Sequence, residues 1–195
     1  MSSANPSRTP GKRWRRSVIA AGRLALLAAA FFCIHHVQRD REWTAAQVLD
    51  PAWLAIVREL LPEAGAFADP APDDPLTAVL DAQQETIGWV TQTAPESLAI
   101  TGYSGPSTLL VIFDRTRHVR GTRLLSSADT AGHLAMITDT PAFFTQWNDR
   151  PAASLGALET PDTVSGATLT SEAIARGLAA RFGAADAAEW FPEPT

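Results

Sequence analysis

The spacing of hydrophobic residues changes along the chain, and each spacing predicts a different kind of element. Residues 17–37 form one nearly unbroken apolar stretch, SVIAAGRLALLAAAFFCIHHV. A helix of about 21 residues, rising ~1.5 Å per residue, crosses a hydrocarbon core of roughly 30 Å. We therefore expect a transmembrane anchor there. Arg23 lies close enough to its N-terminal end for the guanidinium to reach the headgroups.

Residues 43–61 have apolar side chains at helical spacing, with Pro51 suited to a first helical turn. We expect a helix here that packs on the domain that follows. Residues 62–75, PEAGAFADPAPDDP, are rich in proline and acidic residues and are a poor candidate for regular structure.

Short apolar runs follow at 87–90, 107–114 and 119–125, and a polar turn separates the last two. Runs of this length, bounded by turn residues, predict an antiparallel meander. Because side chains alternate along a strand, one of two sets within 107–114 should face the core. These sets are Leu110 and Ile112, or Leu109, Val111 and Phe113, whereas Arg115, Arg117 and Arg123 should face water.

Two helices are expected in the last third of the chain. Residues 133–147 are helical around Pro141, and their aromatic side chains Phe143, Phe144 and Trp147 fit core packing better than a cofactor cage. Residues 169–182 form an amphipathic helix. Its expected buried face holds Ile174, Ala175 and Leu178, and its expected exposed face holds Glu172, Arg176 and Arg181.

Together these elements predict an α+β fold, in which one N-terminal transmembrane helix precedes a small domain with an antiparallel sheet and packed helices. The expected organisation is a basic cytoplasmic tail at 1–16, the anchor at 17–37, a helix and Pro/Asp-rich linker at 42–84, the domain at 85–185 and a C-terminal tail at 186–195.

Charge divides the chain into two unlike parts. Residues 1–41 hold eight of the sixteen Lys and Arg residues and a single acidic residue, so residues 42–195 carry a net charge of −12. The basic cluster before the anchor predicts a cytoplasmic N-terminus and a domain outside the cytoplasm, at the inner membrane. A cleaved signal peptide is the alternative to the anchor. An acidic domain of this kind also argues against nucleic-acid binding.

Candidate redox and metal ligands are few. Cys33 is the only cysteine, which excludes an intrachain disulfide, a c-type haem attachment and a cysteine-ligated iron–sulfur cluster. His35 and His36 lie at the end of the anchor, where interfacial placement explains them better than haem ligation. His118 fits a turn, and His133 either touches a cofactor or is simply exposed. No metal site is assigned.

The candidate site is the polar stretch DTVSGATLTS at 162–171, which leads into the last helix. In one interpretation a hydroxyl of Thr168, Thr170 or Ser171 caps the helix, which is the common use of such side chains. In the other, Gly166 and Ala167 let the backbone approach a phosphate, which the helix N-terminus would hold. No acid or histidine at a recognisable spacing could activate Thr168 for hydrolysis, so no catalytic residue is assigned.

The stretch resembles the D-x-x-[ST]-G-A-T signature of the FMN-binding domain family, through Asp162, Ser165, Gly166, Ala167 and Thr168. That family includes flavin subunits of sodium-translocating NADH:quinone oxidoreductase and of Rnf-type complexes, and the periplasmic domain of nitrous-oxide-reductase regulators. The resemblance implies that residues 85–185 form an FMN-binding domain. It also implies FMN joined through its phosphate to the Thr168 hydroxyl by a dedicated flavin transferase.

Two upstream segments extend the resemblance. Residues 102–105, GYSG, are similar to the family's turn of the same spelling, and residues 129–134, DTAGHL, are similar to its E-T-P-G-L-G element. The resemblance implies that Tyr103, Ser104, Thr130 and Gly132 line the flavin. Asp129, Ala131, His133 and Leu134 depart from the family pattern.

Function follows from the anchor and the resemblance together. We expect a membrane-anchored flavoprotein that relays electrons between a membrane redox partner, containing iron–sulfur clusters, and an extracytoplasmic acceptor. One alternative is a regulatory or maturation module that supports a nitrous-oxide-reductase-like enzyme. Another is a flavin-free interaction domain in which Thr168 only caps its helix.

Overall fold

The computed structural model describes residues 27–31, 50–69, 74–157, 161–183 and 190–191. Most of the expected anchor at 17–37, together with the tail at 1–16, lies outside these residues. Residues 27–31 are helical and exposed. Within the described part of the chain, no helix is both long enough and apolar enough to cross a membrane.

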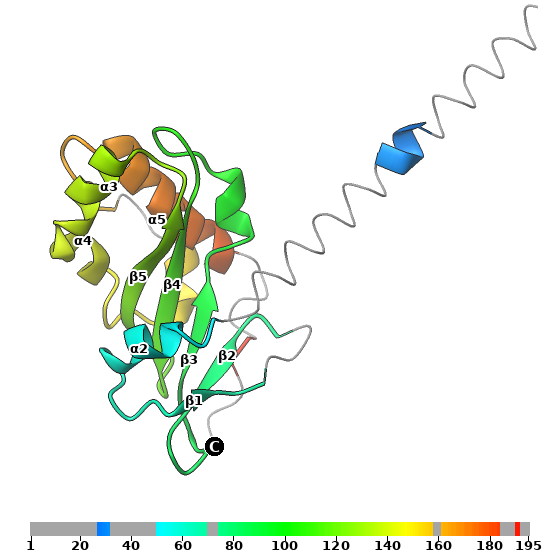
Figure 1. The fold of residues 1–195 in the computed structure, drawn as a ribbon, viewed down its shortest axis with the longest axis vertical. Coiled ribbons are helices and arrows are strands. Elements are labelled where there is room, and N and C mark those ends of the chain that lie inside the picture. The colour runs from blue at the N-terminus through cyan, green and yellow to red at the C-terminus, as the bar shows by residue number, and fades with distance from the viewer. Residues whose placement is uncertain (1–26, 32–49, 70–73, 158–160, 184–189, 192–195) are drawn as a thin grey trace, which may run out of the picture. The chain divides into compact units, whose positions relative to one another are not determined.

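The domain is built on a five-stranded antiparallel sheet in which neighbours in sequence are neighbours in space (Figure 1). Its strands are β1 (Ala66–Phe67), β2 (Thr77–Leu80), β3 (Thr86–Gln92), β4 (Ser107–Asp114) and β5 (Val119–Ser127). The predicted meander is therefore confirmed. β1 and β2 lie within residues 42–84, so that segment contributes to the sheet as well as a helix.

Helices cover both faces of this sheet. On one face lies α2 (Trp53–Arg58), and on the other lie α3 (Ala131–Thr138), α4 (Pro141–Thr145) and α5 (Thr168–Phe182) (Figure 1). Two short 3-10 helices, η1 (Glu96–Ala99) and η2 (Ala152–Ala157), pack beside α5. Of the helix expected at 43–61, the structure shows Trp53–Arg58 as α2, and residues 43–49 lie outside the described residues. The α+β class is confirmed.

Strand β4 is buried on both faces, which settles the choice that its sequence left open. Leu110 and Ile112 pack with Val57 of α2. Leu109, Val111 and Phe113 pack in the larger cluster under α3, α4 and α5. Both sets of alternating side chains therefore face a hydrophobic core.

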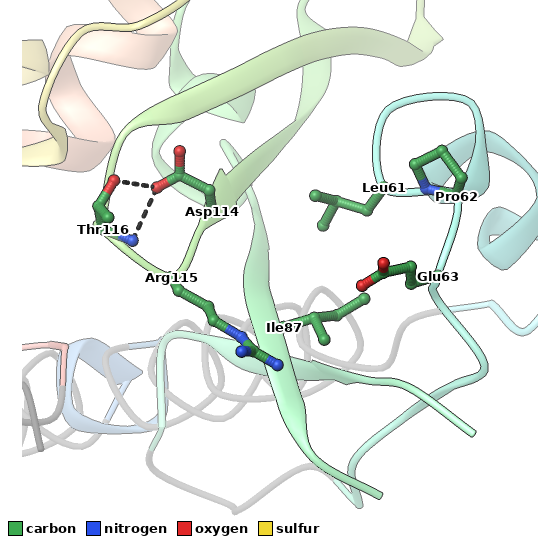
Figure 2. A pocket seen from close by; sticks show the side chains of 7 residues that line it. All are labelled: Leu61, Pro62, Glu63, Ile87, Asp114, Arg115 and Thr116. Atoms are coloured by element: carbon green, nitrogen blue, oxygen red, sulfur yellow. Dashed lines mark hydrogen bonds between the residues drawn. The ribbon is translucent and has the colours of Figure 1, made fainter. Parts of the chain in front are cut away.

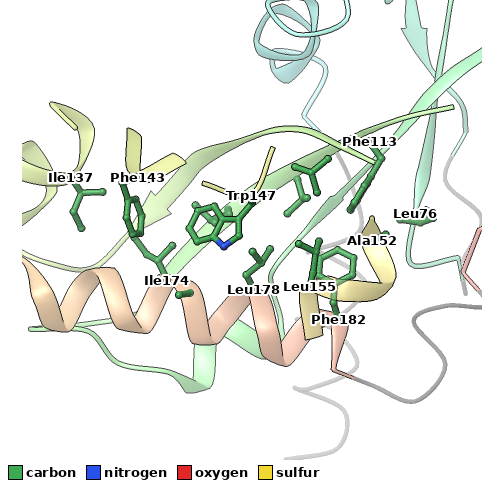
Figure 3. Close-up of a cluster of buried hydrophobic side chains, with 14 of the residues drawn as sticks. Leu76, Phe113, Ile137, Phe143, Trp147, Ala152, Leu155, Ile174, Leu178 and Phe182 are labelled. Carbon is green, nitrogen blue, oxygen red and sulfur yellow. The ribbon is translucent and has the colours of Figure 1, made fainter. Parts of the chain in front are cut away.

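The larger cluster holds α5 against the sheet (Figure 3). Ile174 and Leu178 of α5 are buried there with Phe143 and Trp147, as the amphipathic pattern predicted. Trp147 is 1% exposed and lies edge-on to Phe143, with ring centroids 5.2 Å apart. Phe143 and Trp147 are thus core residues, and Phe144 packs against the same cluster.

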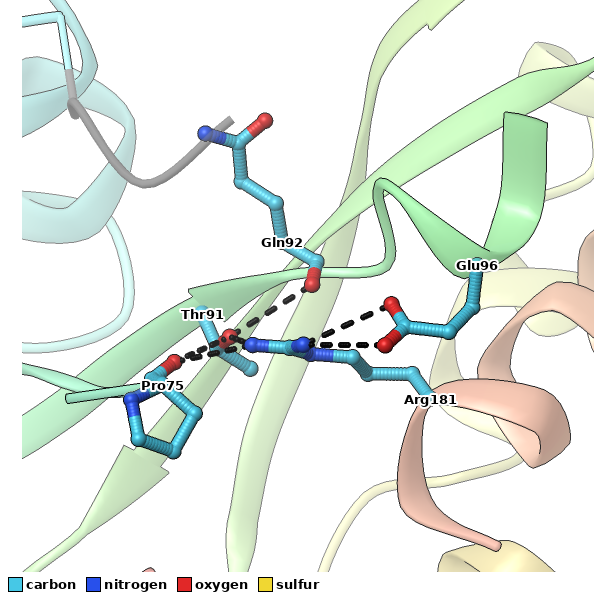
Figure 4. Close-up of polar contacts among 5 residues, drawn as sticks. All are labelled: Pro75, Thr91, Gln92, Glu96 and Arg181. Carbon is cyan, nitrogen blue, oxygen red and sulfur yellow. Dashed lines mark hydrogen bonds and ion pairs between the residues drawn. The ribbon is translucent and has the colours of Figure 1, made fainter. Parts of the chain in front are cut away.

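Arg181 corrects the predicted exposed face of α5. Its side chain is 2% exposed, not solvated. Its guanidinium lies 3.3 Å from a carboxylate oxygen of Glu96 and donates further hydrogen bonds to the Pro75 carbonyl and the Thr91 hydroxyl (Figure 4). Seven residues separate Arg181 from Ile174, so both lie on the same side of the helix. The charge of Arg181 is accommodated by these partners, and Trp190 lies over its guanidinium at 4.7 Å.

Candidate functional site

The candidate attachment residue, Thr168, is the first residue of α5 and is exposed. Ala167 is the N-cap, and the first bond of the helix runs from the Ser171 N–H to the Ala167 carbonyl at 2.9 Å. The N–H groups of Thr168, Leu169 and Thr170 come before that bond and have no acceptor inside the helix. They give this end of α5 a partial positive charge.

The turn before α5 requires a glycine. Gly166 has a φ of +84°, a conformation that costs a residue with a side chain roughly 1–2 kcal/mol. A Cβ on Gly166 would also lie 3.0 Å from the Met136 sulfur. The buried Ser171 hydroxyl holds the turn in place, because it donates to the Ala167 carbonyl and accepts from the Val164 N–H.

The hydroxyl groups of this segment do not cap α5. Its first turn receives no hydrogen bond from a capping side chain. Thr170 donates instead to Asp129, and Ser171 donates to a carbonyl of the preceding turn. Among the described residues, the Thr168 hydroxyl makes no hydrogen bond to the helix end. The cap interpretation therefore does not hold for α5, and Thr168 is exposed.

Asp129 joins three segments that are far apart in the sequence. One carboxylate oxygen accepts from the N–H groups of Ser104 and Thr130, each at 2.9 Å. The other accepts from the Tyr103 N–H at 2.9 Å and from the Thr170 hydroxyl. Burial alone would raise the pKa of Asp129, but the hydrogen bonds from Thr170 and the three N–H groups outweigh it and lower the pKa. Four hydrogen bonds therefore hold the Asp129 carboxylate in one position.

The hydrogen bonds of Asp129 hold the turn at 102–105 against the beginning of α5. A Cβ on Gly102 would lie 2.6 Å from the Asp129 carboxylate and 3.1 Å from the Thr170 Cα. A larger residue at this position would therefore displace the Asp129 carboxylate and crowd the backbone of Thr170. The GYSG turn at 102–105 and the beginning of α5 are therefore neighbours in space.

An exposed aromatic ring and two exposed apolar side chains lie on the segments next to Thr168. Tyr103 is 57% exposed, Met136 47% and Leu169 57%. The Tyr103 ring lies against the His133 ring, with centroids 4.2 Å apart and a tilt of 32°. Exposed apolar side chains on neighbouring segments are a feature of ligand sites. Neither Met136 nor Leu169 was predicted as a site residue. The fold alone brings Met136 beside Gly166, whereas Leu169 directly follows Thr168 in the sequence.

The other predicted site residues are all exposed. Ser104 and Thr130 donate their backbone N–H groups to Asp129. Gly132 has open space where a Cβ would stand, and Ser165 and Asp162 lie in the segment that leads into α5. The Asp162 N–H donates to the Gln146 side chain at 2.9 Å, which fixes the backbone and leaves the carboxylate in solvent. The structure thus brings the predicted residues to one end of the domain.

A cavity of about 420 Å³ lies elsewhere (Figure 2). Its walls are formed by Leu61, Pro62, Glu63, Ile87, Asp114, Arg115 and Thr116. It adjoins the last residue of β4, whereas the 102–105 turn precedes the first. The eight residues of β4, at ~3.3 Å each, separate the two sites by about 25 Å. This cavity is separate from the candidate site around Thr168.

These features define a class of protein: an α+β domain that presents an exposed threonine at a positively polarised helix end, next to the exposed Tyr103 ring. Comparison with protein families identifies the class more closely, because residues 102–181 match the FMN-binding domain family. This match supports an FMN-binding domain at these residues and a flavin-binding role. No curated protein matches the chain.

The residues of the site fit an FMN group. Gly166 shapes the turn at the helix end, the free N–H groups of α5 suit a phosphate, and the exposed Tyr103 and Leu169 suit a planar ring. The chemistry that bound FMN supplies is electron transfer. The protein contributes position and electrostatics to it.

Proposed function

We propose that this protein is a membrane-anchored, extracytoplasmic flavoprotein whose Thr168 carries FMN through a phosphoester bond. The observation that carries the proposal is the position of Thr168. The last residue of the family signature is also the first residue of α5, where it is exposed and takes no part in capping the helix. Its hydroxyl is available for modification.

Attachment replaces the proton of the Thr168 hydroxyl with the FMN phosphoryl group. The co-reactant is a flavin dinucleotide, which a flavin transferase binds. A bond forms between Thr168 Oγ1 and the flavin phosphorus, the pyrophosphate bond breaks, and a nucleoside monophosphate leaves with the electron pair. The hydroxyl proton is released to solvent. The N–H groups of Leu169 and Thr170 stabilise the negative charge of the resulting diester. Asp162 remains accessible to the transferase.

The surface around Thr168 supports the ring of the bound group. Tyr103 and Leu169 offer exposed apolar area, and Met136 lies against the attachment turn. Ser104, Thr130 and Gly132 border this surface. A bond to the protein keeps the cofactor in place outside the cytoplasm, where a dissociated FMN would be lost by dilution.

The proposed role is relay of electrons between a membrane redox protein that contains iron–sulfur clusters and an extracytoplasmic acceptor. The sequence of residues 17–37, with the basic cluster before it, supports an inner-membrane anchor with the N-terminus in the cytoplasm. The net charge of −12 on residues 42–195 supports protein partners and not nucleic acid. The chain offers no haem or cluster ligation through cysteine in the domain, because Cys33 precedes it.

The attachment is tested by intact mass spectrometry of the full chain, produced in membranes with and without a flavin transferase. Wild type should gain the mass of one FMN less one water and fluoresce in a denaturing gel. Thr168→Ala should gain nothing, and Thr168→Ser, which keeps a hydroxyl, should be modified. Thr163→Ala is the matched control, because Thr163 is also exposed and lies five residues earlier. An unmodified wild-type chain would show that the covalent bond does not form.

Location is tested separately by adding protease to intact spheroplasts. We expect the domain to be digested while the basic N-terminal tail stays protected. Protection of the whole chain would contradict the proposed orientation.

A further inference from the structure

The segment that leads into α5 carries five hydroxyl side chains, and the fold treats them differently. In chain order they are Thr163, Ser165, Thr168, Thr170 and Ser171. The last two are fully buried, and they donate hydrogen bonds to Asp129 and to the Ala167 carbonyl respectively. The first three are exposed, and of these Thr168 alone belongs to the helix. The fold therefore encloses two of the hydroxyls and presents Thr168 at the helix end.

The two buried hydroxyls fix the backbone on either side of Thr168. Ser171 accepts a hydrogen bond from the Val164 N–H at 3.1 Å, which ties the turn before Thr168 to the helix. Thr170, two residues after Thr168, donates to Asp129. One turn of an α-helix contains 3.6 residues, so Thr168 and Thr170 lie in the same turn and move together.

Asp129 connects this turn of the helix to the rest of the domain. Besides the Thr170 hydroxyl, its carboxylate accepts from backbone N–H groups in the 102–105 turn and at the start of α3. The 102–105 turn also packs directly on α5, because a Cβ on Gly102 would lie 3.1 Å from the Thr170 Cα. In the described part of the chain, the Thr168 hydroxyl is not a hydrogen-bond partner of this carboxylate. Asp129 is therefore placed to hold the helix end and not to act as a base on Thr168.

We propose that Asp129 is a positioning residue for the attachment of FMN, and that it acts through the hydroxyl of Thr170. This inference rests on the proposed function, in which Thr168 Oγ1 loses its proton, takes the FMN phosphoryl group from a flavin dinucleotide and releases a nucleoside monophosphate. The attacking and leaving oxygens must lie roughly in line at the phosphorus. A displacement of about 1 Å in such a geometry slows a reaction by up to ~100-fold. The flavin transferase thus modifies the folded domain, and its turnover depends on the Asp129–Thr170 contact.

The test measures turnover by a purified flavin transferase on full chains in mild detergent, with a flavin dinucleotide as second substrate and intact mass as the readout. Thr170→Val keeps the shape of the side chain and removes the hydroxyl, whereas Thr170→Ser keeps the hydroxyl. We expect kcat to fall by about 10–100-fold for Asp129→Asn and for Thr170→Val, with KM for the flavin dinucleotide unchanged. Thr170→Ser should stay close to wild type.

A double-mutant cycle tests whether the two residues act through one contact. If they do, Asp129→Asn combined with Thr170→Val should lower kcat no further than Asp129→Asn alone. If the two fold-changes multiply instead, Asp129 does not act through Thr170 and the proposal is wrong. Tryptophan fluorescence checks that each chain is folded. Should Asp129→Asn not fold, the comparison of Thr170→Val with Thr170→Ser decides the question.

A general loss of stability is separated from misplacement of Thr168 by a control far from the site. Val79→Ala removes buried side-chain volume from the cluster on the α2 face of the sheet. Partial unfolding lowers the concentration of usable chain, so Val79→Ala should raise the apparent KM for the chain and leave kcat unchanged.

Two results would overturn the proposal. One is a wild-type kcat in both Asp129→Asn and Thr170→Val, and the other is an equal fall of kcat in Val79→Ala. In either case the wild-type chain is still modified, so the attachment itself stands. A wild-type chain that stays unmodified contradicts both the attachment and this inference.

Discussion

Replacing Asp129 with asparagine tests whether its carboxylate holds the two turns of the site together. Each oxygen of Asp129 accepts two hydrogen bonds, so the amide nitrogen of the variant would face two donors. A buried donor left without an acceptor costs roughly 1–3 kcal/mol. Allowing for rotation of the Thr170 hydroxyl, we expect Asp129→Asn to lower the free energy of unfolding by about 3 kcal/mol.

The assay is thermal unfolding of the full chain in mild detergent, followed by tryptophan fluorescence. Trp147 is 1% exposed and reports on the core that α5 covers. For a domain of this size, about 3 kcal/mol lowers the melting temperature by about 10 °C. The control is Asp139→Asn, because Asp139 is exposed and its carboxylate braces nothing in the described structure. It should change stability by less than about 0.5 kcal/mol.

The effect of pH gives a second check. The pKa of Asp129 is lowered in the folded protein, so the unfolded chain binds more protons as the solution is acidified. The stabilisation is fully present above the unfolded value of about 3.9 and is lost as pH falls through the folded pKa. The deficit of Asp129→Asn should therefore be constant near neutral pH and shrink below about pH 4. If Asp129→Asn has the melting temperature of wild type, or if its loss of stability is the same at acid and neutral pH, the carboxylate does not hold the two turns together.

Three further substitutions test the remaining parts of the argument by the same unfolding assay. Thr168→Ala should change stability by less than about 0.5 kcal/mol, since no cap bond is lost; a loss near 1 kcal/mol would restore the helix cap. Gly166→Ala should cost about 1 kcal/mol through its positive φ, whereas Gly132→Ala, in open space, should cost nothing. Arg181→Met should cost about 3 kcal/mol by breaking a buried ion pair, and the exposed Arg176→Met almost nothing.

The elements with a strong local pattern were predictable from the sequence. The predicted helix at 169–182 differs from α5 by one residue, because its apolar spacing and the polar turn before it are local signals. The 107–114 strand was equally clear as an apolar run. Its orientation was not, since alternation identifies a buried face only when the other face is solvated, and here helices cover both.

The features that could not be predicted from the sequence depend on contacts between residues far apart in the chain. Arg181 was expected in solvent because arginine is rarely buried, but its partner Glu96 lies 85 residues earlier and only the fold brings them together. β1 formed in a segment whose prolines and acidic residues argued against structure, because pairing with β2 supplied its hydrogen bonds. The Asp129–Thr170 hydrogen bond likewise joins residues 41 positions apart, which only the fold brings together.

These long-range contacts explain how a short signature becomes a site. The signature itself specifies only a glycine turn and a hydroxyl at a helix end, which many proteins contain. In this fold α5 is fixed at both ends, by Asp129 at its first turn and by Arg181 at its last. A cofactor bonded to Thr168 would therefore be attached to a rigid element and not to a loop, and its distance to a redox partner would be set by the fold. Loss of the Asp129 or the Arg181 contact should make the position of α5 less well defined, while the Thr168 hydroxyl remains present for attachment.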